Sequence, residues 1–242
     1  MRTVRSGRGL SVVLFAFSTL LLYGQDSQPP PAASEPPTHP VMLMFQERIS
    51  SASINNLLAR VNEQVNKGVH KITILINSEG GETSAAFFAY NVLKGMQNVE
   101  ISTFNLANID SAAIILYCAG DKRYSVPGPG PRFLIHSNAI DMVVGIPVEI
   151  RLDPNTLDAD LQQLKTLNQI TAHVITAIAP SKTAEVEKAF QSQLILTPEQ
   201  ARDWGIVTEI KKSYTELGAV LIAVDSGPNR VPKSPEVRSL AQ

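Results

Sequence analysis

The chain is poor in cysteine and carries no excess of positive charge, and each shortage excludes a class of protein. Only one of its 242 residues, Cys118, is a cysteine, so neither an internal disulfide nor a cysteine-based zinc cluster can form. The 21 basic residues face 22 acidic ones and form no basic tract, which argues against DNA, RNA and anionic membrane surfaces as partners. A hydrophobic fraction of 44% is too high for a disordered chain. The composition therefore indicates a globular protein with one sizeable core or two small ones.

The first 24 residues have the pattern of a signal peptide. Arg2, Arg5 and Arg8 precede an apolar run, Leu10–Tyr23, whose 14 residues are too few to span a bilayer comfortably. We therefore expect residues 1–24 to direct export to the periplasm or the medium, with an uncleaved N-terminal anchor as the alternative. Their removal leaves 18 basic and 22 acidic residues, a net charge of −4.

Proline marks the borders of the predicted domain. Six of the 16 prolines fall between residues 29 and 40, so we interpret residues 25–40 as an extended linker. Residues 225–242 are polar, with a glycine and three prolines, and are expected to form a disordered tail. The folded domain is therefore predicted over residues 41–224, a normal size for one domain.

Within these borders, strand-like and helix-like segments alternate. Short β-branched or apolar runs predict strands at 41–45, 71–76, 99–104, 133–135 and 206–210. Helical spacing and start signals predict helices at 54–65 and 85–96, and from Ser111, Pro154 and Pro198. The helix from Pro154 is the longest, with one apolar face made of Leu157, Leu161, Leu164, Ile170, Val174 and Ile178. This order predicts an α/β fold with parallel strands and helical crossovers.

Three features at strand ends carry candidate chemistry. Gly80 and Gly81 follow a buried strand, where their backbone N–H groups can approach an oxyanion, or where they serve only to make a turn. Ser111 stands between a strand and an apolar helix, which suits a nucleophile or a helix N-cap. His136 ends a strand, which suits a general base or a histidine that only satisfies a hydrogen bond. Singly these features are ambiguous, but their order is informative.

That order resembles the ClpP family of serine peptidases, within the ClpP/crotonase superfamily. The matching segments are INSEGG at 76–81, NIDSAAIILYCAGDKRY at 108–124, FLIH at 133–136 and LTPEQARDWGIV at 196–207. Ser111 and His136 are 25 residues apart, which is also the spacing of that family. The resemblance covers about residues 43–210 and implies a repeated β-β-α superhelix with a parallel sheet and a long handle helix, matched here by 137–151 and the helix that follows.

The resemblance also implies roles for individual residues. Ser111 would be the nucleophile, His136 the general base, and backbone N–H groups at Gly80, Gly81 and Ala112 the oxyanion hole. The implied activity is peptide-bond cleavage through an acyl-enzyme, in a homo-oligomeric ring. We expect no cofactor and no metal ion.

The sequence departs from the family at the triad acid. Counted back from Leu196-Thr197-Pro198, the position of the family's aspartate falls on Ala189. An alanine can neither orient a histidine nor stabilise its protonated form. Glu185, Glu187 and Asp110 are the neighbouring acids that would substitute, so the acid is left unassigned.

Export, if it occurs, bears on substrates and partners. An exported chain has neither ATP nor an ATP-driven unfoldase, so the expected substrates are short or already unfolded peptides. The runner-up hypothesis, motivated by Ala189, is a non-catalytic oligomeric binding or scaffold protein. A third hypothesis, acyl-thioester chemistry of the crotonase type, is disfavoured because coenzyme A is scarce outside the cytoplasm and the sequence has no basic patch for its phosphates.

Overall fold

A computed structural model describes residues 39–139, 154–215 and 218–224. The predicted signal peptide, most of the predicted linker, the predicted tail and residues 140–151 of the predicted handle segment lie outside these residues. The strands are β1 (Val41–Phe45), β2 (Lys71–Ser78), β3 (Glu100–Asp110), β4 (Lys122–Ser125), β5 (Arg132–Ile135), β6 (Leu194–Leu196), β7 (Glu209–Ile210) and β8 (Val220–Val224). The helices are α1 (Ser51–Asn66), α2 (Thr83–Lys94), α3 (Ala113–Cys118), α5 (Pro154–Ile178), α6 (Thr183–Ala189) and α7 (Pro198–Trp204), with a short 3-10 turn at Pro180–Lys182.

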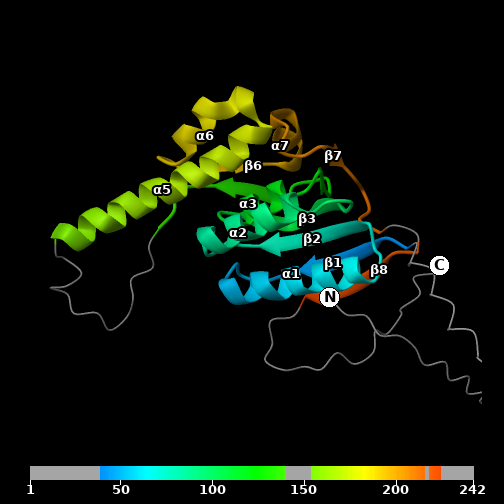
Figure 1. Ribbon diagram of the computed structural model, residues 1–242. Helices are drawn as coiled ribbons and strands as arrows, with labels where there is room; N and C mark the ends of the chain where they lie inside the picture. Colours follow the sequence, from blue (N-terminus) through cyan, green and yellow to red (C-terminus); the bar gives the residue numbers. More distant parts are fainter. Residues whose placement is uncertain (1–38, 140–153, 216–217, 225–242) are drawn as a thin grey trace, which may run out of the picture. The chain divides into compact units, whose positions relative to one another are not determined.

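The strands form a single, mostly parallel sheet (Figure 1). Its main order is β6-β5-β3-β2-β1-β8, with β4 joining β3 to β7 beside this path. Every pairing is parallel except that of β5 with β6, which is antiparallel. This arrangement confirms the α/β fold predicted from the sequence.

Strand β3 is the centre of the sheet and changes partner along its length. Its first half, Ser102–Asn105, pairs with β4, whereas Asn108–Asp110 pairs with β5. On its other side the register with β2 shifts: from Ile76 to Ser78, β2 advances by two residues while β3 advances by four. Such a bulge bends a strand and redirects the residues after it. The end of β3 is thereby turned toward the loop that follows β2.

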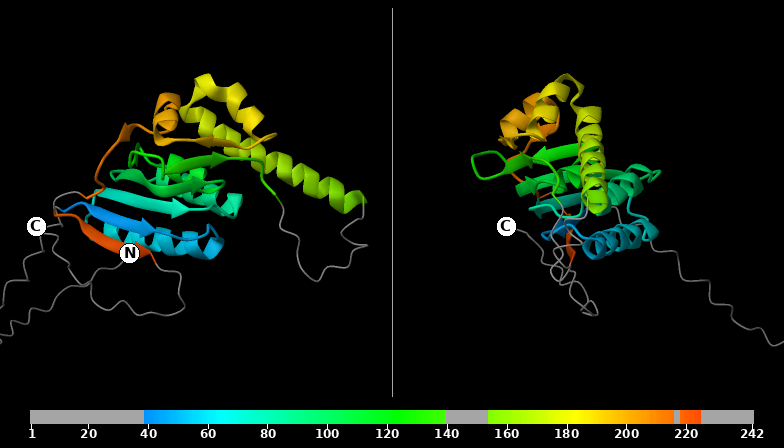
Figure 2. Two further views of the ribbon diagram at one scale, coloured as in Figure 1. Left: turned by 180° about the vertical axis from the view of Figure 1, so that it is seen from behind. Right: turned by 90° about the vertical axis from the view of Figure 1, so that its left-hand side faces the viewer.

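Most of the hydrophobic core lies between the sheet and one layer of helices. Alternate residues of β1 and β2 face this layer, where they pack against α1, α2 and α3 (Figures 1 and 2). Helix α3 is buried on all sides, which explains why it contains no charged residue. The buried hydroxyl of Tyr117 in α3 donates a hydrogen bond to the Tyr124 carbonyl at 2.9 Å, so α3 is fixed against β4. On the opposite face of the sheet, Met42, Leu75 and Phe104 pack with Tyr124 in a smaller cluster.

Two helices begin at the capping residues that their sequences provide. The Ser50 side chain accepts from the N–H of Ser53, and the Ser53 side chain accepts from the N–H of Ser50, at the start of α1. Thr197 and Gln200 make the same reciprocal pair at α7, with Pro198 at its first position. The start of α7 predicted from the sequence is therefore confirmed.

Helix α5 packs against the body over only part of its length. Its buried residues are Thr171, Val174 and Ile175, all in the C-terminal half. Leu157 and Leu161 belong to the apolar face predicted from the sequence, yet they are exposed, because the N-terminal half extends past the sheet (Figures 1 and 2). No helix within the described ranges is both long and apolar enough to cross a membrane.

Candidate active site

Ser111 occupies a backbone conformation that few serines adopt. It follows the last residue of β3 with a φ of 55°, in the left-handed region, and its N–H donates to the Leu134 carbonyl of β5 at 2.8 Å. Non-glycine residues persist there only when their surroundings hold them, and such positions concentrate at functional sites. A sharp strand-to-helix turn of this kind exposes a hydroxyl, as it does in hydrolases with a nucleophile elbow. The conformation therefore favours a nucleophile over a simple helix cap, since α3 has Ala112 as its N-cap.

The two predicted glycines make a turn that needs glycine at both positions. Gly80 has a φ of 90° and Gly81 a φ of 145°. A Cβ on Gly80 would lie 2.6 Å from the Asp110 carbonyl oxygen, and one on Gly81 would lie 2.0 Å from the Ile49 carbonyl oxygen. Backbone hydrogen bonds between this turn and Ile49 hold it in place. The turn is thus packed directly against the residues around Ser111.

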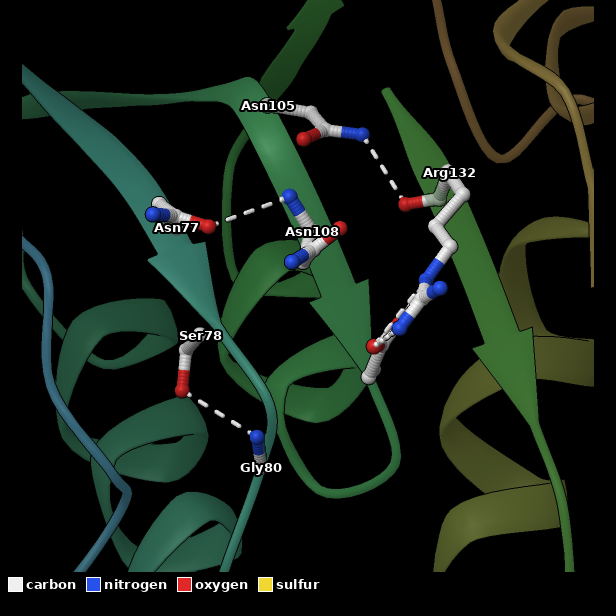
Figure 3. A network of polar contacts seen from close by, with 7 residues as sticks. Asn77, Ser78, Gly80, Asn105, Asn108 and Arg132 are labelled. Carbon is white, nitrogen blue, oxygen red and sulfur yellow. Dashed lines mark hydrogen bonds and ion pairs between the residues drawn. The ribbon is translucent and has the colours of Figure 1, made fainter. Parts of the chain in front are cut away.

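The predicted oxyanion donors differ in how they are engaged. The Gly80 N–H donates to Ser78 Oγ at 3.2 Å (Figure 3). Among the described residues, the N–H groups of Gly81 and Ala112 have no hydrogen-bond partner. The Ala112 nitrogen lies 3.0 Å from the place of a Gly80 Cβ, so the two candidate segments are adjacent. Unengaged N–H groups next to a serine are what oxyanion stabilisation requires.

One cleft brings together four of the five sequence-predicted site residues, whereas Ala112 is buried and does not line it. Ser111, His136, Gly80 and Gly81 all line a cavity of about 710 Å³, which Asn138 also borders. The Ser111 hydroxyl makes no hydrogen bond to any residue that the structure describes. The His136 Nδ1 lies 2.6 Å from the Ser137 carbonyl oxygen, which fits a ring that carries its proton on Nδ1. Such a tautomer leaves Nε2 free to accept a proton.

An ion pair holds the residue that precedes the serine. Asp110 is buried, and Arg132 of β5 donates to both of its carboxylate oxygens, with Nη2 2.6 Å from Oδ2 (Figure 3). This hydrogen bonding raises the pKa of Arg132. Nearby, the Asn108 N–H donates to Asn77 Oδ1 at the bulge of β3 (Figure 3). Asp110 is therefore committed to fixing the end of β3 and is not the acid that orients His136.

Asn138, two residues after His136, connects three parts of the site. Its side-chain oxygen accepts from Thr83 at the start of α2. Its backbone N–H and its side-chain amide both donate to Asn168 Oδ1 of α5 at 2.8 Å, and the amide also lies 3.5 Å from Thr171 Oγ1. Thr83 and Thr171 are buried. The group Thr83, Asn138, Asn168 and Thr171, which we name the Asn138 clamp, ties the segment after His136 to both helices.

Comparison with known proteins places this architecture in a family. The family model described as Clp protease matches residues 41–214. The chain belongs to the Clp protease family. It is 28% identical over 191 residues to the ATP-dependent Clp protease proteolytic subunit 1 of Mycolicibacterium paratuberculosis, covering 75% of this chain and 86% of that protein. It is 25% identical over 181 residues to the corresponding subunit of Thermobifida fusca, covering 71% and 78%.

A solved structure supports the fold. A mutant of ClpP1 from Listeria monocytogenes superposes with a TM-score of 0.58 at 20% sequence identity, covering 72% of this chain and 92% of that one. The family model confirms the resemblance of the sequence to the ClpP family, and the superposition confirms the α/β architecture.

The structure shows where the residues considered for the third member of a Clp-type triad lie. Ala189, the position reached by counting along the sequence, is buried in the core at the end of α6. Glu185 in the same helix pairs with Lys182, and Glu187 is exposed. None of these residues lines a cavity with His136. The residues that share the second cavity beside His136 include Gln191, Ser192 and Gln193, which the sequence analysis did not single out.

Sequence reasoning also missed the supports around the Clp-type site. Arg132 is a charged residue one position before the FLIH segment, and Asn138 is a polar residue two positions after His136. Their closeness in sequence to the Phe133–His136 segment was the only available signal. Their partners Asp110 and Asn168 are 22 and 30 residues away, a separation that no local pattern reveals.

Proposed function

We propose that this member of the Clp protease family is a serine-type endopeptidase that cleaves short or unfolded peptides. The observation that carries the proposal is the placement of Ser111, which is held in a left-handed conformation and lines the same cleft as His136 and the glycine turn. Peptide hydrolysis needs a nucleophile, a base and an oxyanion site in one place. The described residues supply a candidate for each.

The proposed reaction proceeds through an acyl-enzyme. Ser111 Oγ attacks the scissile carbonyl carbon while its proton passes to Nε2 of His136, which gives a tetrahedral oxyanion. The C–N bond then breaks, and His136 donates the proton to the departing amine. Water, deprotonated by His136, attacks the resulting ester, and the acid product leaves with Ser111 restored.

The oxyanion of both steps would be stabilised by backbone donors. The N–H groups of Gly81 and Ala112 are unengaged within the described part of the chain and need not break a hydrogen bond to serve. One such donor typically contributes about 3 kcal/mol to transition-state stabilisation. Gly80, whose own N–H is held by Ser78, would act mainly by allowing the turn to approach Ser111.

The shape of the cleft supports flexible substrates. It is open to solvent and measures about 710 Å³, a volume that accommodates a few residues of extended chain. Folded proteins present few such segments, whereas short or unfolded peptides present many.

Labelling with a fluorophosphonate probe tests the nucleophile. We expect wild type to be labelled, Ser111→Ala to be unlabelled, and His136→Ala to react at least 100-fold more slowly. Ser84→Ala is the matched control, because Ser84 lines the same cleft, is exposed and has a side chain that makes no hydrogen bond within the described residues. An unlabelled wild type, or equal labelling of wild type and Ser111→Ala, would overturn the proposal and favour a non-catalytic binding protein.

Export and self-association are two further parts of the proposal. The basic start and the apolar run of residues 1–24 support export, which a reporter fused after residue 40 would reveal in a fractionated cell.

The named relatives are proteolytic subunits, which supports a homo-oligomer. Light scattering of the purified chain without residues 1–24 tests this, and a monomer at all concentrations would overturn it.

A further inference from the structure

His136 lies between two cavities. The first, of about 710 Å³, contains Ser111, whereas the second, of about 450 Å³, is lined by His136 with Leu134, Ser137, Gln191, Ser192 and Gln193. An imidazole that uses one ring nitrogen toward a serine needs a partner for its other nitrogen. The second cavity is where that partner would lie.

The strand register singles out one residue of this cavity. Strands β5 and β6 are antiparallel, with Leu134 opposite Ile195 and Ile135 opposite Leu194. Continuing the register by one residue sets His136 opposite Gln193. Because side chains alternate along a strand, both lie on the more exposed face with Leu134, away from buried Ile135. Directly opposite residues have Cβ atoms about 5 Å apart, within reach of a glutamine amide.

No carboxylate among the described residues makes a hydrogen bond to His136. The charged residues that share a cavity with it are Glu47, Arg48, Glu79 and Glu82, all in the first cavity. His136 makes no hydrogen bond to any of them, and the second cavity has no charged residue along its described lining. The Gln193 side chain has no hydrogen-bond partner in the part of the chain that the structure describes.

We propose that Gln193 is the positioning residue of His136, an uncharged amide in the place where a serine–histidine pair usually has a carboxylate. This inference rests on the proposed function. The amide oxygen accepts the Nδ1–H of the ring, alongside the Ser137 carbonyl oxygen that Nδ1 already contacts at 2.6 Å. Both acceptors favour the tautomer whose Nε2 is free for Ser111. Neither carries the negative charge that stabilises the imidazolium formed during attack.

The test replaces the amide by a carboxylate of the same shape. In Gln193→Glu we expect the midpoint of the His136 titration, followed by NMR in the full folded chain, to rise by about one pH unit. Gln191→Glu is the matched control, because it adds the same charge to the same cavity two residues away, and its shift should be less than half as large. At neutral pH, fluorophosphonate labelling of Ser111 should become about ten-fold faster in Gln193→Glu.

Two outcomes would overturn the inference: an unchanged midpoint in Gln193→Glu, or equal shifts in the two glutamate variants. Gln193→Ala gives a further check. Loss of the amide should slow the labelling of Ser111 about ten-fold, whereas Gln193→Glu, which keeps an acceptor at this position, should not be slowed. Equal labelling of Gln193→Ala and wild type would also contradict the role. The titration requires no turnover, so a wild type that never reacts with the probe would refute the proposed function without deciding the role of Gln193.

Discussion

Gly80 lies against Ser111 so closely that a methyl group on its Cα would stand 2.7 Å from the serine Cβ. Real Cβ atoms do not approach other atoms to this distance, and the other two nearest atoms, the Asp110 carbonyl oxygen and the Ala112 nitrogen, are backbone atoms that cannot easily move aside. The glycine turn and the serine therefore form one packed unit, and the position of each depends on the other.

Gly80→Ala should destabilise the protein and move Ser111. The left-handed φ costs about 1 kcal/mol for alanine, and overpacking adds about 1 to 3 kcal/mol, which urea unfolding would measure. Gly128→Ala separates the two effects, because Gly128 has a φ of 105° but nothing within 4 Å of its Cβ position. Similar losses in both variants would show that the contact with Ser111 contributes nothing.

Arg132→Gln should lower the stability of the protein by removing the ion pair with Asp110, the residue before Ser111. It leaves the Asp110 carboxylate, whose side chain is only 4% exposed, without its cationic partner, and we expect a loss of about 1 to 3 kcal/mol in unfolding free energy. Arg202→Gln is the control, because Arg202 is about as exposed as Arg132 but its partner Asp203 is 68% exposed. A loss below about 0.5 kcal/mol is expected there. Equal losses would contradict a special role for Asp110.

Asn138→Ala should uncouple the His136 segment from α2 and α5. It removes hydrogen bonds to Thr83 and Asn168, so we expect a loss of about 1 to 2 kcal/mol and labelling of Ser111 at least ten-fold slower. Gln163→Ala serves as the control, since Gln163 lines the same cleft but is exposed, and its side chain has no hydrogen-bond partner among the described residues. Unchanged labelling in Asn138→Ala would show that the Asn138 clamp is purely structural.

Cys118 should make the free energy of unfolding depend on pH in the alkaline range. Burial raises the pKa of its thiol from 9.0 to about 12, so the unfolded chain loses this proton at a lower pH than the folded one. The stabilisation from the neutral buried thiol is thus complete below pH 9.0 and is lost between pH 9.0 and about 12. In that window, wild type should lose up to about 1.4 kcal/mol per pH unit more than Cys118→Ala.

The measurement is urea unfolding of both chains at several pH values. Tyr117 titrates in both chains; burial is the main cause of its raised pKa, and only the smaller contribution from Cys118 differs between them. Parallel plots of unfolding free energy against pH would contradict the predicted role of the thiol. A native thiol that reacts readily with a thiol reagent at pH 8 would do the same.

What the sequence predicted and what it missed follow from the range of the interactions. The cap of α7 was predictable because Thr197 and Gln200 are three residues apart. Ser111 and His136 could be proposed because their segments have distinctive patterns, and the cleft brings them together. The apolar face of α5 was visible, but periodicity does not tell how much of a face is covered, so the exposure of Leu157 was not foreseen.

The position of Gln193 relative to His136 could be inferred only from the pairing of the strands in the sheet. The register, continued by one residue, sets Gln193 opposite His136 because β6 pairs with β5 in the antiparallel direction, in a sheet whose other pairings are parallel. Counting along the sequence instead reached Ala189, whose helical segment turns into the core. A pairing across about 60 residues leaves no local signal in the amino-acid pattern.

The pairing of β5 with β6 also bears on the order in which parts of the molecule can fold. Pairing Phe133 with Leu196 closes a loop of about 60 residues, and this costs more conformational entropy than forming the short turn that joins β2 to α2. During folding, the glycine turn and the end of β3 can therefore form while β6, which directly follows Gln193, is still unpaired. We therefore expect a refolding chain to place Ser111 before it places the segment beside His136, and to gain reactivity toward a fluorophosphonate probe only when β6 pairs with β5.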